Sequence, residues 1–197
     1  MNRITLLARS LAIGIMALTL GGCGVVVVGA AVTGASVAHD RRPAETIVAD
    51  KNIYLKANEL RNTNPDIQQK ADIDIDVYNQ KVLLTGMAEN TTIIDRFQQD
   101  VAAIASVKTV YNEVAIGADP TLAEATEDSY LTSRVKVSLF NVKIEGFDPT
   151  RVKVVSSQGS VYLMGLLTPT EADAVVEEVR YVSGVKRVVK LFDNYDA

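Results

Sequence analysis

The sequence has one cysteine, one histidine and no tryptophan, and these absences exclude several kinds of site. Cys23 has no partner for a disulfide within the chain, and His39 precedes the part that we expect to fold. A histidine–cysteine metal centre and a histidine-dependent catalytic triad are therefore excluded from that part. We expect a non-catalytic protein that uses no cofactor and no metal.

The sequence also lacks an excess of positive charge, with 20 basic against 24 acidic residues. The formal net charge is −4, and removal of an N-terminal segment containing Arg3 and Arg9 would make it −6. Proteins that bind nucleic acids need a basic surface that neutralises phosphates. The charge balance therefore argues against a nucleic-acid partner.

The N-terminus has the order of features expected of a bacterial lipoprotein signal. Arg3 and Arg9 precede an apolar run over residues 11–20, and Leu20-Gly-Gly-Cys23 resembles a lipobox. This resemblance implies cleavage before Cys23 and attachment of diacylglycerol to its thiol. Gly24 follows Cys23, where Asp would favour retention at the inner membrane, so we expect a lipid anchor in the outer membrane. The alternative is a membrane-spanning helix, because residues 24–32 extend the apolar run.

One stretch of the sequence occurs twice. Val82-Leu-Leu-Thr-Gly86 returns 79 residues later as Val161-Tyr-Leu-Met-Gly165, and after these glycines the offset falls to 78 residues because Met87 is one extra turn residue. A repeat of this length indicates two copies of one supersecondary unit. Function should therefore be sought in what differs between the two copies.

Each copy is predicted to run helix–strand–strand–helix–strand. Asp50 and Asp128 are suitable N-caps for the two opening helices. Apolar residues at helical spacing follow each glycine, as with Ile94, Phe97 and Val101 in the first copy. Two helices on one face of a three-stranded mixed sheet would give an α+β sandwich. Each copy is only about 65 residues long and marginal alone, so we expect the copies to pack together.

These patterns divide the chain into five parts. The predicted parts are a signal peptide at 1–22, a lipidated cysteine and tether at 23–49, a first domain at 50–116, a linker at 117–127 and a second domain at 128–197. The later part of the tether, residues 40–49, is equally compatible with packing on the first domain.

The repeated unit resembles a BON domain. The αββαβ order, Val161-Tyr-Leu-Met-Gly-Leu-Leu-Thr168 and Val182-Ser-Gly-Val-Lys-Arg-Val188 carry the resemblance. Two such domains behind a lipobox are similar to a dual-BON outer-membrane lipoprotein. The resemblance implies a periplasmic protein that binds anionic phospholipid, supports outer-membrane integrity and gathers at sites of cell division.

The opening helices of the two copies differ on one flank. The second helix carries Tyr130, Arg134, Val137, Phe140 and Asn141, whereas the aligned positions of the first helix hold Asn, Lys, Glu, Asn and Thr. A helix with more apolar surface than its own core needs is a candidate contact surface. The aromatic residues suit the boundary between acyl chains and headgroups, and Arg134 suits phosphates.

This assignment agrees with the resemblance, which attributes lipid contact to the same helix. The dual-BON lipoprotein that the chain resembles has Trp at the position of Tyr130, so lipid affinity here could be lower. The alternative is that Tyr130, Val137 and Phe140 pack against the first domain. Ser183 and Arg187 match family positions near the same patch, although a plain turn and a solvated strand residue explain them equally well.

Three acidic residues, Asp72, Asp74 and Asp76, suggest calcium binding at first sight. An EF-hand loop that began at Asp72 would require Gly at the position of Val77 and Glu at the position of Leu83. The spacing instead fits the wet face of a strand whose other face is buried. The alternative to a lipid-binding protein is a periplasmic scaffold that holds envelope assembly or quality-control proteins on the same helix flank.

Overall fold

The computed structural model describes residues 40–118 and 121–196. The predicted signal peptide, Cys23 and the first part of the tether lie outside these residues. In the first copy the elements are α2 (Ala44–Thr63), α3 (Pro65–Lys70), β1 (Ala71–Tyr78), β2 (Lys81–Ala88), α4 (Thr91–Ala102), β3 (Thr109–Asn112) and β4 (Ala115–Ile116). The short helix α3 was not predicted, because Asn64-Pro65 ends one helix and also begins the next: the Asn64 side chain accepts from two backbone N–H groups of α3.

The second copy follows the same plan. Its elements are α5 (Leu122–Ser138), the 3₁₀ turns η1 (Leu139–Asn141) and η2 (Pro149–Arg151), β5 (Lys153–Ser157), β6 (Ser160–Met164), β7 (Leu166–Leu167), α6 (Pro169–Val179), β8 (Arg187–Lys190) and β9 (Asp193–Asn194). Thr168 caps α6 and closes a capping box with Glu171, and Pro169 occupies the first turn, where its missing N–H costs little.

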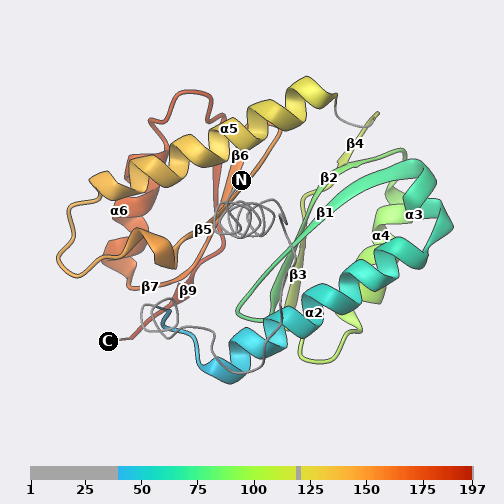
Figure 1. The fold of residues 1–197 in the computed structure, drawn as a ribbon, viewed down its shortest axis with the longest axis horizontal. Helices are drawn as coiled ribbons and strands as arrows, with labels where there is room; N and C mark the ends of the chain where they lie inside the picture. Colours follow the sequence, from blue (N-terminus) through green and yellow to red (C-terminus); the bar gives the residue numbers. More distant parts are fainter. Residues whose placement is uncertain (1–39, 119–120, 197) are drawn as a thin grey trace, which may run out of the picture. The chain divides into compact units, whose positions relative to one another are not determined.

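The predicted mixed sheets are confirmed. β1 pairs antiparallel with β2, which pairs parallel with β3, and β5, β6 and β8 repeat this order. β4 adds a short parallel pair to β2 in the first sheet, and β7 and β9 form a separate parallel two-stranded sheet. Figure 1 shows α2 and α4 along the strands of the first copy, and α5 and α6 along those of the second.

Each copy has its own apolar core between its helices and one face of its sheet. Ile53 from α2, Leu84 from β2 and Phe97 from α4 meet in the first core. The second core joins Leu131 and Val135 from α5 with residues of the strands and of α6. The helical periodicity of the sequence predicted the core positions on the helices, because residues three and four apart share one face.

The opposite faces of the two sheets pack on one another. A third cluster of buried residues, here called the domain junction, contains Tyr78, Leu83, Tyr162, Met164 and Leu191. Polar contacts at its rim also join the two copies: Lys81 pairs with Asp193 at 2.5 Å, and Lys153 pairs with Asp76 at 2.8 Å. The expected packing of the copies is thus made by the sheets.

The two opening helices begin earlier than predicted, and the prediction that Asp50 and Asp128 cap them is wrong. α2 starts at Ala44, and α5 starts at Leu122 with Thr121 as its cap. Each aspartate is the seventh residue of its helix and holds the turn between the two following strands. Asp50 accepts from the backbone N–H groups of residues 79 and 80 at 2.7 and 2.6 Å, and Asp128 accepts from those of residues 158 and 159 at 2.7 and 3.1 Å.

The turns explain this role. All four of these turn residues have positive φ, the conformation of a two-residue turn that matches the twist of a β-hairpin. In each turn, the two backbone N–H groups have no partner in the sheet, and both point at the carboxylate of one aspartate. An aspartate suits both a helix cap and this turn, so residue type alone does not distinguish the two roles.

Candidate functional site

The flank of α5 that distinguishes the two copies lies at the surface. Tyr130, Arg134 and Val137 follow one another at intervals of four and three residues and so share one side of the helix. Phe140 continues them in the turn η1. Tyr130, Val137 and Phe140 are 64%, 70% and 69% exposed. We call these four residues the α5 stripe.

A tyrosine from outside α5 joins the stripe. Tyr181, which comes just after α6, is 73% exposed and lies with Tyr130, Arg134 and Val137 around a shallow groove of about 550 Å³. The rest of the groove is lined by Val182 and by four polar residues, Ser133, Ser138, Asn141 and Ser183. This open surface thus combines aromatic rings, aliphatic side chains and hydroxyl groups.

Arginines lie against both exposed tyrosines. The Arg134 guanidinium carbon is 5.6 Å from the centre of the Tyr130 ring, and that of Arg180 is 5.3 Å from the Tyr181 ring. Both distances fall within the range of cation–π attraction. Arg180 also pairs with Glu177 at 3.3 Å, whereas Arg134 makes no ion pair with any described residue. Arg134 is therefore the cation of this surface that has no acidic partner.

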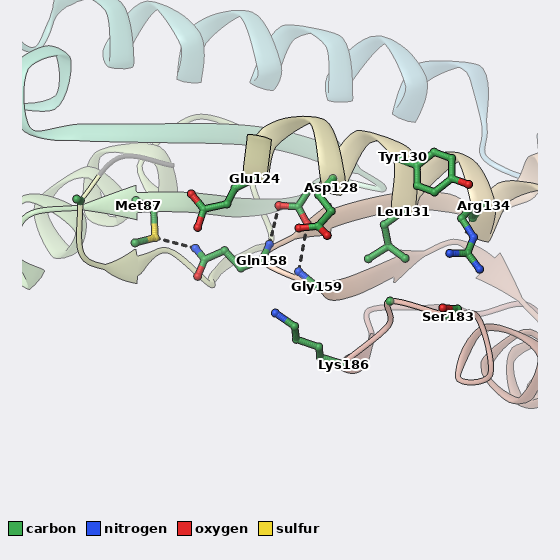
Figure 2. Close-up of a pocket in the computed structure, with 13 residues that line it drawn as sticks. Met87, Glu124, Asp128, Tyr130, Leu131, Arg134, Gln158, Gly159, Ser183 and Lys186 are labelled. Carbon is green, nitrogen blue, oxygen red and sulfur yellow. Dashed lines mark hydrogen bonds between the residues drawn. The ribbon is translucent and has the colours of Figure 1, made fainter. Parts of the chain in front are cut away.

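A second, deeper pocket of about 560 Å³ adjoins the groove and shares Tyr130, Arg134 and Ser183 with it. Figure 2 shows Arg134 descending from α5 and Lys186 on the loop opposite, with Asp128 bonded to the hairpin turn. Glu124 also lines this pocket and closes the α5 capping box. Backbone and hydroxyl hydrogen bonds from Thr121 lower the Glu124 pKa.

The other predicted residues fall in two places. Ser183 lines both cavities, and Asn141 lies in the groove, where its side-chain amide donates to Glu178 at 3.1 Å. Arg187 lies elsewhere, at the rim of the domain junction, where it pairs with Glu113 at 2.7 Å and donates to the Tyr162 hydroxyl at 3.1 Å. The hydrogen bond to Glu113 raises the Arg187 pKa. Its charge is therefore engaged between the copies.

The structure contradicts the alternative in which Tyr130, Val137 and Phe140 pack against the first domain. The junction buries residues of the strands, and the stripe remains exposed. Tyr181 was missed because the comparison of the copies stopped at the opening helices. At the offset of 78 residues its counterpart is Ala103, so the same comparison carried to the second helix would have found it.

The three aspartates of β1 lie on the face opposite its buried residues, as the alternation predicted. Burial, followed by the charges of Asp72 and Asp76, raises the pKa of Asp74. The part of the chain that the structure describes contains no cluster of three side chains suited to hold a metal ion. Within that part, none of the helices has the length and apolar character needed to cross a membrane.

Residues 50–118 and 127–193 both match the BON domain. The chain is 32% identical over 178 residues to "Outer membrane lipoprotein DolP" of Haemophilus influenzae, covering 90% of this chain and 91% of the relative. It is 31% identical over 155 residues to "21 kDa hemolysin" of Actinobacillus pleuropneumoniae, covering 78% of each.

A solved structure, the C-terminal domain of CdsD from the type III secretion system of Chlamydia trachomatis, aligns over 75% of this chain and 67% of its own length. The sequence identity to that domain is 16% and the TM-score is 0.29. The two matched regions coincide with the two copies, and the long alignment to a relative spans both of them. The chain therefore belongs to the BON domain family and is a dual-BON protein similar to DolP.

Proposed function

We propose that this chain is a non-catalytic outer-membrane lipoprotein that binds anionic phospholipid through the α5 stripe of its second BON domain. The relative that aligns along nearly the whole chain is named an outer membrane lipoprotein, and Cys23 follows a lipobox-like segment. In this proposal Cys23 carries the anchor and the folded part lies at the periplasmic face. Support of outer-membrane integrity at division sites is the role that the resemblance implies.

The observation that carries the proposal is the exposed stripe with its unpaired arginine. Three large apolar side chains of the stripe and Tyr181 stay in solvent although the core of the domain is complete without them. Aromatic residues of this kind favour the membrane interface, with the ring among acyl chains and the polar tip among headgroups. Arg134 lies within the stripe, and a basic residue near an anionic surface contributes about 1 kcal/mol.

Vesicle co-sedimentation tests the proposal. The fragment of residues 35–197 lacks Cys23, so binding to vesicles cannot come from the anchor. We expect it to sediment with phosphatidylglycerol vesicles more than with phosphatidylcholine vesicles. Phe140→Asp should abolish binding, because it replaces an aromatic ring by a charge that the anionic surface repels. Arg134→Gln should weaken binding about fivefold, the loss of about 1 kcal/mol.

The matched control is Leu55→Asp, which makes the same kind of change at an exposed apolar position of α2 in the first domain. It should bind like the wild type. Circular dichroism of each variant shows that the fold is intact. If the wild-type fragment ignores both kinds of vesicle, the lipid proposal is wrong, and a scaffold for envelope assembly or quality-control proteins becomes the better explanation. Crosslinking at the α5 stripe would then identify the partner.

A further inference from the structure

The four residues that precede α2 contact both BON domains. Arg41 reaches the second domain: its guanidinium makes a two-pronged ion pair with Glu171, with nitrogen–oxygen distances of 2.5 and 2.9 Å. It also donates to the carbonyl oxygen of Leu166 at 3.2 Å and lies 4.2 Å from the centre of the Tyr195 ring. Three separate groups of the second domain therefore hold this one side chain.

Arg42, the next residue, reaches the first domain. Its guanidinium donates to Asp50 at 2.6 Å and to Asp40 at 2.6 Å, and it lies 3.9 Å from the centre of the Tyr78 ring. Asp50 is the residue that holds the β1–β2 turn, so Arg42 completes the network around that turn. Neighbouring arginines thus contact different domains.

The partners of the two arginines also contact each other. The backbone N–H of Leu166 donates to the Tyr78 hydroxyl at 3.3 Å, while the carbonyl oxygen of the same residue accepts from Arg41. The contacts therefore close a ring that runs from Arg41 through Leu166 and Tyr78 to Arg42. Each of the two arginines is thus linked to both domains through the contacts of its partners.

Burial makes the Arg41 contact costly to lose. Glu171 is only 3% exposed, and it already accepts from the backbone N–H of Thr168 at the start of α6. A buried carboxylate requires a cation or several hydrogen bonds, and the planar fork of an arginine is the strongest such partner. The described residues offer it one other cation, Arg151, at the longer distance of 3.8 Å.

We propose that Arg41 and Arg42 form a clasp that fastens the root of the tether to both domains and so couples them. The clasp also fixes where the tether leaves the folded part. It holds the N-terminal end of α6, whereas Tyr181 of the lipid-contact surface follows the C-terminal end of the same helix. That helix has 11 residues, a length of about 16 Å. This second consequence, in which the clasp sets where the tether leaves the folded part relative to the α5 stripe, depends on the proposed function.

Hydrogen exchange of the full mature chain in detergent micelles tests the coupling without any vesicle. In Arg41→Gln, we expect amides of the second domain at Leu166 to exchange roughly ten- to hundredfold faster, as loss of a charged hydrogen bond implies. The amides of the β1–β2 turn in the first domain should also accelerate. If acceleration is confined to residues 40–43, the two domains are not coupled by the clasp and the proposal fails.

Two further variants keep the test decisive. Arg180→Gln removes the same charge from an exposed ion pair of the second domain and should change neither region. Arg41→Lys retains the positive charge but not the planar fork of the guanidinium. It should fold at least as readily as Arg41→Gln, and its amide exchange rates should lie between those of the wild type and those of Arg41→Gln. Wild-type exchange in Arg41→Lys would overturn the role of the fork.

Reconstitution into phosphatidylglycerol vesicles tests the positioning. We expect amides around the α5 stripe to be protected by the membrane in the wild type and less protected in Arg41→Gln. Equal protection in both proteins would overturn the positioning role. No protection in either protein would refute the proposed lipid contact, while the exchange measured in micelles would still decide whether the clasp exists.

Discussion

Two adjacent leucines of β2 offer a test of how the domains support each other. Leu84 points into the core of the first domain and Leu83 into the domain junction, and neither has exposed surface. Truncation of a fully buried leucine to alanine costs about 2–5 kcal/mol, from lost transfer energy and the cavity left behind. For a chain of this size each kcal/mol lowers the melting temperature by about 2–4 °C. Both variants should therefore melt about 4–20 °C below the wild type.

The shape of the transition should differ between the two variants. Scanning calorimetry compares the measured enthalpy with the van't Hoff enthalpy, and the ratio is close to one when a protein unfolds as one unit. We expect a ratio near one for the wild type and for Leu84→Ala. Leu83→Ala weakens the contact between domains, so its ratio should exceed one as the domains begin to unfold separately. If Leu83→Ala keeps a ratio of one, or costs less than about 1 kcal/mol, the sheets do not stabilise each other.

Three further predictions concern single positions. Asp128→Ala removes the acceptor of two turn N–H groups and should cost about 1–3 kcal/mol in urea denaturation, with partial recovery in Asp128→Asn. Gly86→Ala should cost more than about 3 kcal/mol, because φ is +109° and the new carbon would lie 2.0 Å from a backbone oxygen of β1; Gly146→Ala, with φ of +73° and open space, should cost about 1 kcal/mol. Burial alone would raise the Glu171 pKa, but hydrogen bonds led by that of Arg41 outweigh it and lower the pKa below its ordinary value of 4.5. The stability from this group is present above about pH 4.5 and lost as the pH falls through the folded-state pKa, so wild-type unfolding free energy should drop more steeply on acidification than that of Glu171→Gln.

The repeat predicted most of the fold because both copies carry the same apolar periodicity. Residues such as Phe97 and Val175 are buried where the helical spacing placed them. The boundaries were less predictable: Asp50 and Asp128 have the chemistry of helix caps, yet each binds a turn that is formed about 30 residues later. Contacts over such a separation leave no local pattern in the sequence.

The candidate site was predicted where the copies differ in residue type, as at Tyr130 and Phe140. Arg187 also differs from its counterpart, Thr109, but its strand borders the domain junction and its charge meets Glu113. A strand residue faces one side of the sheet or the other, and the sequence does not tell which side the partner domain covers. Positions where the two copies differ at the exposed surface therefore look the same in the sequence as positions where they differ at the domain junction.

The face-to-face packing of the sheets has a consequence for how such a duplicated protein diversifies. Each sheet has one face under its own helices and part of the other face against its twin, so the strand residues at the domain junction are constrained on both sides. Substitutions there must keep two sets of neighbours satisfied at once. The outer sides of the helices carry no such double constraint, and a new surface can arise on one copy while the other preserves the pairing. The first domain then acts as the partner that leaves α5 of the second free to acquire aromatic and basic residues.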